Sequence, residues 1–560
     1  MFKKTDPNPQ LDIFTAPSMQ LGSRASKKYS DPNAWHNQFY SLVTTKIDEE
    51  IFKPLFPEGK KSGRPNASIR ILVAMSVLKE GFGCSDEDLF EKCEFDLLTR
   101  KALGMELLTD VTPSIDTYYL FRRRICEYQE RTGIDLMQLC FEQLAGKHVH
   151  LLKISGKCVR MDSKLIGSNI ARQSRYELIH TTLVKFLKTC TLTHLSPEQE
   201  ERAKEYLKED SSKTVYRSDS DTLQSNLARI GNFIMEMLAT FPATSPAHDL
   251  LQRLFDEQYA VKDGKAVLRD KKEVKADSLQ NPNDPDAPYR TKNDQKVQGY
   301  VTNITETVEE GKPNIITSVQ VETAVFADCH FLQEAVENSE RVTDSTIEDL
   351  YADGAYQSPD NREFAKNHNA MQLKTGKMQG GCRWELIPHD EDGLTVREIA
   401  TGNTYEAVKA VTKQGSRKRW RIPWNNKTGW RYFEDKDIKA YQLRKQIESL
   451  PLEEQHKRNN VEAAMFQYSF HTRKGKTRYR GLLKHRMHAY SRCMWMNLRR
   501  MVIFQISTFQ RSIFALFGPI REAFGSFKAI SRQIFTSGAD CYVSLRMTTL
   551  VRLDSKYAPF

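Results

Sequence analysis

The spacing of apolar residues predicts that the first part of the chain is helical. From residue 66, the stretch NASIRILVAMSVLKE carries apolar side chains three and four positions apart. After a Gly-Phe-Gly break the same spacing resumes behind Ser85, a suitable helix N-cap. The same periodicity predicts helices over 114–130 and 132–146. Together they indicate an all-α domain near the N-terminus.

A different pattern begins at residue 157, where polar and apolar residues alternate through KCVRMDSKLI and predict a strand. After the turn-rich NPNDPDAPYRTKND, strands and helices alternate. The predicted elements are a β-hairpin of 297–306 and 314–321, a helix at 330–338, a short strand ending near Tyr351, a helix at 360–367 and a strand at 370–374. This alternation is typical of an α/β sheet.

Two segments interrupt the α/β part. One returns to helical spacing with many charges, and the other is rich in Gly, Trp and β-branched residues. The predicted division is an extended or disordered arm, 1–34; a helical domain, 35–150; an α/β core, 151–379 and 434–516, with a helical insertion, 175–256; a β-rich insertion, 380–433; and a C-terminal tail, 517–560.

Composition narrows the class of protein. The 560 residues carry 83 Lys and Arg against 72 Asp and Glu, a net charge of +11 that weakly indicates a polyanionic partner. The ten cysteines are scattered without a CxxC pair, which favours reduced thiols. No stretch reaches the ~18 uncharged apolar residues that a membrane span needs. We therefore expect a cytoplasmic protein without a membrane partner.

Three acidic residues stand at comparable points along the chain. Asp162 lies at the end of the first predicted strand, Asp353 follows the strand EDLYA, and Glu462 lies near the start of the helical stretch VEAAMFQYSF. Converging carboxylates can hold two Mg²⁺ ions roughly 3.5–4 Å apart, which activate an attacking oxygen and stabilise a leaving one. Spacing alone does not establish convergence, because a single Asp at a strand end is more often a helix cap or turn residue.

The residues around these acids resemble a known family. The run RMDSKLIGSNIARQSRYEL at 160–178 resembles the first-aspartate motif of the DDE transposases of bacterial insertion sequences. NPNDPDAPYRTKNDQKVQGYVTNITET at 281–307 resembles the following motif of one subgroup, and DLYADGAYQSPDN at 349–361 resembles its second-aspartate motif. With helical stretches from about residue 35 to 130 that also resemble the family, the likeness covers most of the chain.

The third motif of the family resembles residues 458–500, in which Arg458 precedes Glu462 by one helical turn and can approach a phosphate beside the metal. Related groups carry a Tyr three residues before this Arg and a Lys seven after the Glu, whereas this chain has Gln455 and Ser469. The basic role of that lysine stays open among Lys474, Lys476 and Lys484.

The resemblance implies an α/β protein with a ribonuclease H-like catalytic core beside the all-α domain, the helical insertion and the β-rich insertion. The all-α domain would then serve DNA binding or dimerisation. It implies a bacterial DNA transposase that cleaves the ends of its insertion element and joins the 3′-hydroxyl ends to target DNA by two-metal-ion phosphoryl transfer. Asp162, Asp353 and Glu462 would be the catalytic residues and metal ligands, within about 8 Å of one another.

The same resemblance implies the cofactor and partners. The cofactor would be Mg²⁺, for which Mn²⁺ could substitute. The partners would be double-stranded DNA of the terminal inverted repeats and of the target, and a second copy of the chain in a homodimeric synaptic complex.

Two basic stretches without acidic residues predict DNA contacts. One, 471–486, follows Glu462, and the other, 413–431, lies in the β-rich insertion and is interleaved with tryptophans. The residues expected to contact DNA are Arg458, Arg473, Lys474, Lys476, Arg478, Arg480, Lys484, Arg417, Arg419, Trp420, Trp424 and Trp430. At least one of these tryptophans should be exposed toward the carboxylates. The alternative is that the charges are solvated and the tryptophans form the core of the insertion.

Other interpretations stay open. The helices over 66–102 suit either a helix-turn-helix or a packing role, and the cluster Arg122, Arg123 and Arg124 suits either phosphate contacts or solvated charges. The chain could be a catalytically silent DNA-binding repressor or end-bridging protein, although all three carboxylates are present. A plain metal-dependent nuclease is not separable from a transposase by sequence.

Overall fold

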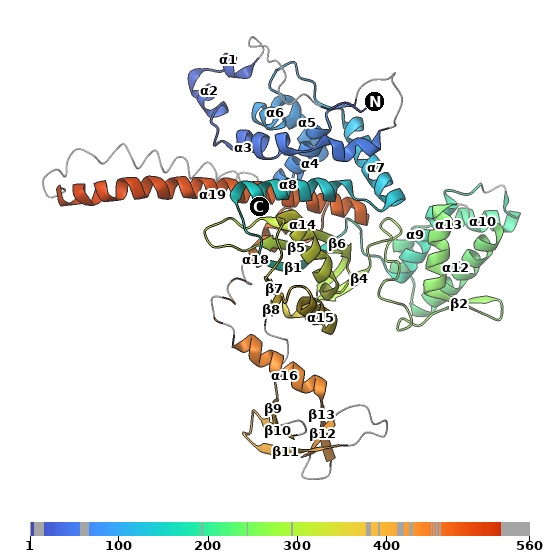
Figure 1. The fold of residues 1–560 in the computed structure, drawn as a ribbon. Helices are drawn as coiled ribbons and strands as arrows, with labels where there is room; N and C mark the ends of the chain where they lie inside the picture. Colours follow the sequence, from blue (N-terminus) through green and yellow to red (C-terminus); the bar gives the residue numbers. More distant parts are fainter. Residues whose placement is uncertain are drawn as a thin grey trace. The chain divides into compact units, whose positions relative to one another are not determined.

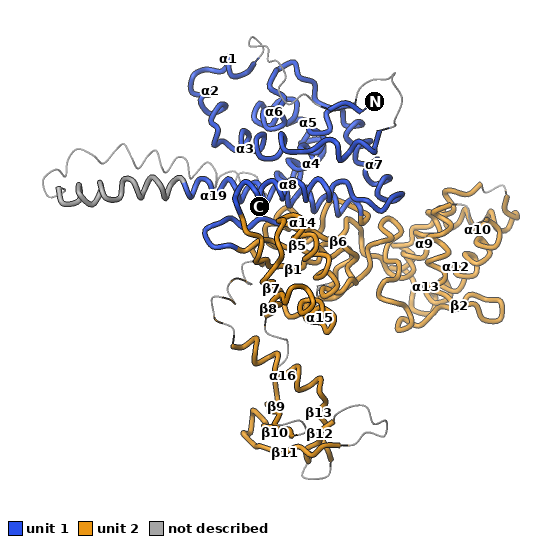
Figure 2. The backbone as a smooth tube through the Cα atoms, in the orientation of Figure 1, with its two compact units in different colours: residues 1–153, 309–316, 483–560 blue, residues 154–308, 317–482 orange. Residues whose placement is uncertain are grey.

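The computed structural model divides the chain into two compact units (Figure 2). Unit 1 comprises residues 1–153, 309–316 and 483–560, and unit 2 comprises residues 154–308 and 317–482. The structure describes residues 2–4, 16–56, 66–191, 194–242, 245–292, 295–376, 382–389, 393–410, 419–424, 429–449, 451, 454, 457 and 461–527. Within these ranges, no helix is both long enough and apolar enough to cross a membrane.

Unit 1 is helical. Its elements are α1 (Pro17–Gln20), α2 (Ser23–Tyr29), α3 (Trp35–Leu42), η2 (Thr44–Lys46), η3 (Glu49–Leu55), α4 (Ile69–Phe82), α5 (Asp86–Phe95), α6 (Leu97–Leu103), α7 (Ile115–Thr132), α8 (Leu136–Leu152) and, from its second residue, α19 (Leu482–Phe527). The helices predicted over 114–130 and 132–146 are therefore confirmed as α7 and α8 (Figure 1). The bounds of α7 are close to those predicted, whereas α8 both begins and ends later than predicted.

Local sequence signals set the helix boundaries around α4 and α5. The Ser68 hydroxyl caps α4 by accepting from the Ile71 N–H, and Gly83 ends it with φ of 66°, a conformation that suits glycine. Ser85 is the N-cap of α5, as predicted, and it forms a capping box with Asp88. These caps satisfy backbone groups that a helix end leaves without partners.

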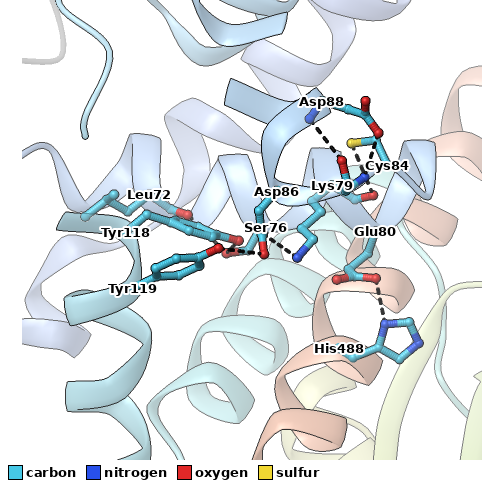
Figure 3. Close-up of polar contacts among 11 residues, drawn as sticks. Leu72, Ser76, Lys79, Glu80, Cys84, Asp86, Asp88, Tyr118, Tyr119 and His488 are labelled. Atoms are coloured by element: carbon cyan, nitrogen blue, oxygen red, sulfur yellow. Dashed lines mark hydrogen bonds and ion pairs between the residues drawn. The ribbon is translucent and has the colours of Figure 1, made fainter. Parts of the chain in front are cut away.

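Polar contacts join several helices of unit 1 (Figure 3). Lys79 of α4 forms a partly buried ion pair with Asp86 of α5 at 2.5 Å, and Asp86 accepts a hydrogen bond from Tyr119 of α7 at 3.1 Å. Glu80 lies 2.6 Å from the Nδ1 atom of His488 on α19. Because buried charges are tolerated when they are paired, these contacts specify how the four helices pack.

The expected extended arm is wrong for part of its length. Residues 17–29 contain α1 and α2, and Tyr29 at the end of α2 is buried. The Tyr29 carbonyl contacts His36 Nε2 at 2.8 Å and accepts from Asn37 at 2.9 Å, while the Lys101 ammonium lies 5.7 Å from the Tyr29 ring centre. Tertiary packing therefore orders a segment whose composition alone favours disorder.

Residues from 483 onward belong to unit 1, whereas the sequence analysis placed 434–516 in the α/β core. Aromatic packing explains the difference. Trp495 of α19 meets Phe82 of α4 at 5.4 Å between ring centres, and Tyr490 meets Phe141 of α8 at 5.9 Å. A Cβ atom at Gly81 would lie 2.3 Å from the Trp495 ring, so this glycine permits the contact and does not break α4.

Unit 2 is built on a mixed six-stranded sheet. Its strands are β1 (Cys158–Gly167), β4 (Tyr289–Lys292), β5 (Gln295–Thr307), β6 (Ile316–Thr323), β7 (Asp349–Ala352) and β8 (Gln372–Thr375). They run in the order β4-β5-β1-β7-β8, with β6 also paired to β5. β1 is antiparallel to β5 and parallel to β7. The predicted α/β alternation is thus confirmed.

The helical elements of the sheet region follow the predicted order. They are η5 (Asp328–Phe331), α14 (Leu332–Thr343), η6 (Gly354–Tyr356), α15 (Pro359–Asn367) and α18 (Val461–Ser469). Val159 and Met161 of β1 share a buried apolar cluster with Leu332 and Val336 of α14. Because side chains alternate along a strand, Asp162 and Lys164 lie on the other face of β1, which α18 contacts.

Both insertions form the structures that were predicted. The helical insertion contains α9 (Arg175–Leu187), α10 (Pro197–Lys208), α11 (Ser211–Arg217), α12 (Ser220–Thr240) and α13 (Pro246–Gln258), followed by a hairpin of β2 (Tyr259–Lys262) and β3 (Lys265–Leu268). It has an apolar core of its own. The β-rich insertion contains β9 (Trp384–His389), β10 (Gly393–Glu398), β11 (Thr404–Lys409), β12 (Arg419–Trp424) and β13 (Gly429–Glu434), then α16 (Asp435–Glu448).

Candidate active site

The two aspartates lie on neighbouring strands. Arg160 of β1 stands opposite Tyr351 of β7 in the parallel register. Two residues further along each chain, 160 + 2 and 351 + 2, are Asp162 and Asp353. Asp353 directly follows the last residue of β7, so the sheet itself brings these two carboxylates together.

Burial makes Asp162 an unusual carboxyl group. The side chain is half-buried, and burial raises its pKa to about 6. The Ser163 N–H donates to its Oδ1 at 2.7 Å, which opposes the shift, and the negative charge of Asp353 adds to it. A desolvated carboxyl group beside a second acidic residue forms a site that favours a proton or a metal cation.

Asp353 also has a structural role. Its Oδ1 atom accepts from the Gly354 N–H at 2.7 Å and thereby caps η6. The cap fixes the Asp353 side chain directly after the last residue of β7, the strand that neighbours β1 and its Asp162. Capping and a place in the candidate site therefore coexist in this residue.

The segment before α18 is anchored beside the aspartates. Arg160 forms a buried ion pair with Glu306 of β5 at 2.5 Å, and its Nη1 donates to the Lys457 carbonyl at 2.9 Å. Tyr351 donates to the Glu454 carboxylate, which also accepts from Lys374 of β8 at 2.9 Å. Between them, residues 454 and 457 therefore contact the paired residues Arg160, Tyr351 and Lys374 of three neighbouring strands.

Charge pairing strengthens this anchor. Lys457 donates to Glu454 at 2.8 Å, and this hydrogen bond, with those from Tyr351 and Lys374, lowers the pKa of Glu454 to about 2. Lys374 also pairs with Asp349 at 2.9 Å. Glu454 therefore stays ionised at neutral pH and holds the start of the α18 segment on the sheet.

The far end of α18 is anchored on the same face. Lys164 donates to the Ser469 hydroxyl at 2.7 Å and to the Met465 carbonyl at 3.4 Å. Thr302 of β5 lies 3.1 Å from the Tyr468 hydroxyl. Burial lowers the pKa of Lys164, which Asp162 partly offsets. Residue 457 thus contacts Arg160 of β1, and the last residue of α18 contacts Lys164 of the same strand.

Glu462 lies between these two anchors. It occupies the first turn of α18 and is exposed. Among the described residues, no three His, Cys, Asp or Glu side chains are arranged to hold a metal ion. Convergence of Glu462 with the two aspartates therefore stays a prediction, and Arg458, its expected neighbour in phosphate binding, lies outside the described residues.

A polar network behind the aspartates was missed by the sequence analysis. The Tyr356 hydroxyl donates to Asn303 Oδ1 at 2.7 Å, and Asn303 donates to Gln320 at 2.8 Å. All three side chains are buried. Burial raises the pKa of Tyr356, and the charges of Asp162 and Asp328 add to this. The sequence carried one sign of this network, namely the polar residues within the predicted strand YVTNITE. In the structure, Asn303 of this strand pairs with Ser163 of β1.

The basic loop after α18 runs beside the end of β1. Arg473 and Lys476 exchange backbone hydrogen bonds of 3.0 Å around Lys474 and Gly475, whose φ angles of 53° and 72° suit a tight hairpin turn. The Gly167 N–H donates to the Gly475 carbonyl at 2.8 Å. The loop is therefore fixed to the strand that carries Asp162.

Exposure alternates along this loop. The side chains of Arg473, Lys474, Arg478 and Arg480 are exposed, as is that of Lys484 at the start of α19. Lys476 differs, because it is half-buried and donates to the Ile170 carbonyl at 2.7 Å. Lys474, Lys476 and Lys484 were the three candidates to replace the lysine that related groups carry after the Glu. Of these, Lys476 makes a contact that holds the loop.

The tryptophans of the β-rich insertion divide between core and surface. Trp420 is only 3% exposed and packs in the apolar core of the insertion, whereas Trp430 is 49% exposed. The Arg421 guanidinium lies 4.2 Å from the Trp430 ring centre, and Arg419 lies 4.0 Å from that of Tyr432. The Trp424 side chain and Arg417 lie outside the described residues.

The comparison with protein families identifies one part of the chain. Residues 28–124 match the family model described as a transposase domain (DUF772). No curated protein and no solved structure matches the chain. The match extends from the end of α2 into α7 and supports a transposase role.

The transposase domain carries the predicted three-arginine cluster on α7. Arg122 lies 5.4 Å from the ring centre of Tyr118, and Arg124 lies 5.8 Å from that of Phe56. Arg123 is exposed and pairs with Glu127 at 3.5 Å. Two of these three side chains are thus engaged with aromatic rings, which favours a packing role for them.

Proposed function

We propose that the chain is a DNA transposase that cleaves the ends of its insertion element and joins the 3′-hydroxyl ends to target DNA by two-metal-ion phosphoryl transfer. The observation that carries the proposal is that Asp162 of β1 and Asp353, directly after β7, each lie two residues beyond the register pair Arg160–Tyr351 of these parallel strands. The match of residues 28–124 to a transposase domain supports the same assignment. A mixed sheet with these strands in its middle supports a ribonuclease H-like core.

The two aspartates fit a divalent cation. Mg²⁺ is usually held by one or two carboxylates together with water and substrate phosphate. Asp162 and Asp353 would supply these carboxylates, and the cation would relieve the repulsion that contributes to the raised pKa of Asp162. Glu462 would join them when DNA draws the exposed first turn of α18 toward the sheet. When bound, Mg²⁺ or Mn²⁺ would polarise the phosphate and favour deprotonation of the attacking hydroxyl.

The protein's own residues would bind and orient the DNA. Arg473, Arg478 and Arg480 are exposed on the loop that pairs with the end of β1. They would bind phosphates on either side of the cut. The contacts at Glu454 and Ser469 hold residues on both sides of Glu462 on the sheet, and Glu462 and Arg458 would contact the same phosphate. A homodimer would bring two element ends and the target together in the synaptic complex.

The test uses purified full-length protein, Mg²⁺ and a duplex that carries the element's flanking inverted repeat. Nicks at the 3′ ends and joined products are scored separately. Asp162→Ala, Asp353→Ala and Glu462→Ala should each abolish cleavage, because each removes a metal ligand but leaves the basic loop intact. Glu363→Ala is the matched control, since Glu363 is an exposed carboxylate in the middle of α15.

The outcomes separate the candidate functions. Nicks followed by joined products support a transposase, and nicks without joining support a plain nuclease. Binding of the repeat without cleavage by the parent protein supports a silent repressor or end-bridging protein. If one acidic variant cuts at the parental rate, that residue does not belong to the site.

A further inference from the structure

Lys164 has an environment that differs from those of Arg160 and Lys374, two other cations on its face of the sheet. It follows Asp162 by two residues on β1, so both side chains lie on the same face. Arg160 pairs with Glu306 at 2.5 Å, and Lys374 pairs with Asp349 and Glu454 at 2.9 Å each. Within the described ranges, Lys164 makes no ion pair and donates to two neutral oxygens.

These neutral contacts fix where the ammonium group lies. The Ser469 hydroxyl at 2.7 Å and the Met465 carbonyl at 3.4 Å hold Lys164 Nζ at the last turns of α18. The side chain is half-buried. A half-buried cation with neutral hydrogen-bond acceptors has lost part of its hydration, and the nearby charge of Asp162 offsets this loss only in part. An anion that completes the site would therefore be favourable.

We propose that Lys164 binds a phosphate oxygen of the DNA strand next to the phosphate that is cut. The proposal rests on the proposed function, because it takes the DNA at Asp162 and Asp353 as the source of the anion. Lysine is a compact charge that binds phosphate well, and three N–H donors leave one for a ligand after the two protein contacts. Ser469 is the positioning residue that keeps the ammonium group beside Asp162.

The experiment compares the parent protein with Lys164→Met on duplexes of the element end. In each duplex one phosphate that flanks the cut is replaced by a neutral methylphosphonate. Single-turnover cleavage and equilibrium binding are measured for every duplex. Lys262→Met is the matched control, because Lys262 is an exposed lysine on a strand of the helical insertion. Lys164→Arg keeps the charge at the tested position.

One flanking methylphosphonate should slow the parent and Lys262→Met by about 10- to 100-fold, the value of one charged hydrogen bond. The same substitution should have no further effect on Lys164→Met, which already lacks the contact, and should still slow Lys164→Arg. A purely structural role would instead lower the melting temperature of Lys164→Met and leave every methylphosphonate penalty unchanged. Equal penalties in the parent and in Lys164→Met overturn the proposal.

Failure of the proposed function is seen separately. If the parent protein cuts no duplex, the transposase assignment fails, and the binding measurements alone then decide whether Lys164 contacts a phosphate. If the parent cuts and Lys164→Met cuts equally fast, the function stands and the assignment of Lys164 is wrong.

Discussion

At the scale of single residues, burial gives Asp162 a pKa of about 6 against an ordinary value of 3.8. Because the folded-state pKa lies above the unfolded one, the folded protein holds this proton more tightly than the unfolded chain does. The associated stability is fully present below about pH 4 and is lost as pH rises through about 6. Without metal, the ionised carboxylate therefore destabilises the fold at neutral pH.

Asp162→Asn should consequently stabilise the metal-free protein at pH 7.5 but not near pH 4. The expected gain at pH 7.5 is up to about 3 kcal/mol, from roughly two pKa units. Urea unfolding in EDTA at both pH values measures it, with Glu363→Gln as a control. Added Mg²⁺ should stabilise the parent more than the variant. An equal effect of the substitution at both pH values would show that packing, and not ionisation, is responsible.

The buried pair of Arg160 and Glu306 leads to a second prediction. Glu306 is fully buried and its carboxylate lies 2.5 Å from Arg160. Glu306→Gln should destabilise the protein by about 3–5 kcal/mol, because it leaves a buried cation without its partner. The exposed pair of Lys157 and Glu348 provides the comparison, since Glu348→Gln should cost less than about 1 kcal/mol. Chemical denaturation of both variants at pH 7 checks the contrast.

At the scale of elements, the sequence predicted what depends on local periodicity. The alternation in KCVRMDSKLI predicted β1, and helical spacing predicted α7 and α8. The helices in the expected arm were missed because the burial of Tyr29 depends on partners such as Lys101, distant in the chain. The assignment of α19 failed for the same reason, since Trp495 packs against Gly81 and Phe82.

The candidate site shows the same division. Asp353 follows a strand as predicted, whereas β1 continues to Gly167, so the expectation that Asp162 ends its strand is wrong. The adjacency of the two residues follows once the two strands pair. The contact of Lys164 with Ser469 spans 305 residues, so no local pattern announces it. The network of Tyr356 and Asn303 is hidden likewise, because polar residues on a predicted strand are ordinarily assigned to solvent.

Two tryptophans of the β-rich insertion should respond differently to substitution. Trp420 is buried, whereas Trp430 is exposed and stacks with the Arg421 guanidinium. Trp420→Ala should destabilise the protein by about 3–5 kcal/mol, as expected for a core aromatic. Trp430→Ala should leave stability unchanged and impair cutting or joining at element ends more than binding to internal duplex, since a lost base stack costs ~1–3 kcal/mol. Thermal unfolding and strand-transfer assays on both variants compare the two. Loss of stability alone in Trp430→Ala would exclude stacking.

At the scale of the whole molecule, the residues that match a transposase domain lie in unit 1, and the two aspartates lie in unit 2. The net charge of +11 is modest for 560 residues, so its local distribution matters more for DNA binding than its total. Arg478 and Arg480 are exposed on either side of the buried Tyr479, in a loop that is tied to β1. Such a loop concentrates positive charge beside the candidate site.

The salt dependence of DNA binding tests this distribution. Each phosphate that a protein neutralises contributes about 0.9 to the slope of log K against log salt. Arg478→Gln with Arg480→Gln should therefore reduce the slope by about 2 and weaken binding to end and internal duplexes alike. Lys262→Gln with Lys265→Gln removes the same charge from an exposed hairpin of the helical insertion and should leave the slope unchanged. Equal slopes for the two double variants would mean that net charge, and not the loop, attracts the DNA.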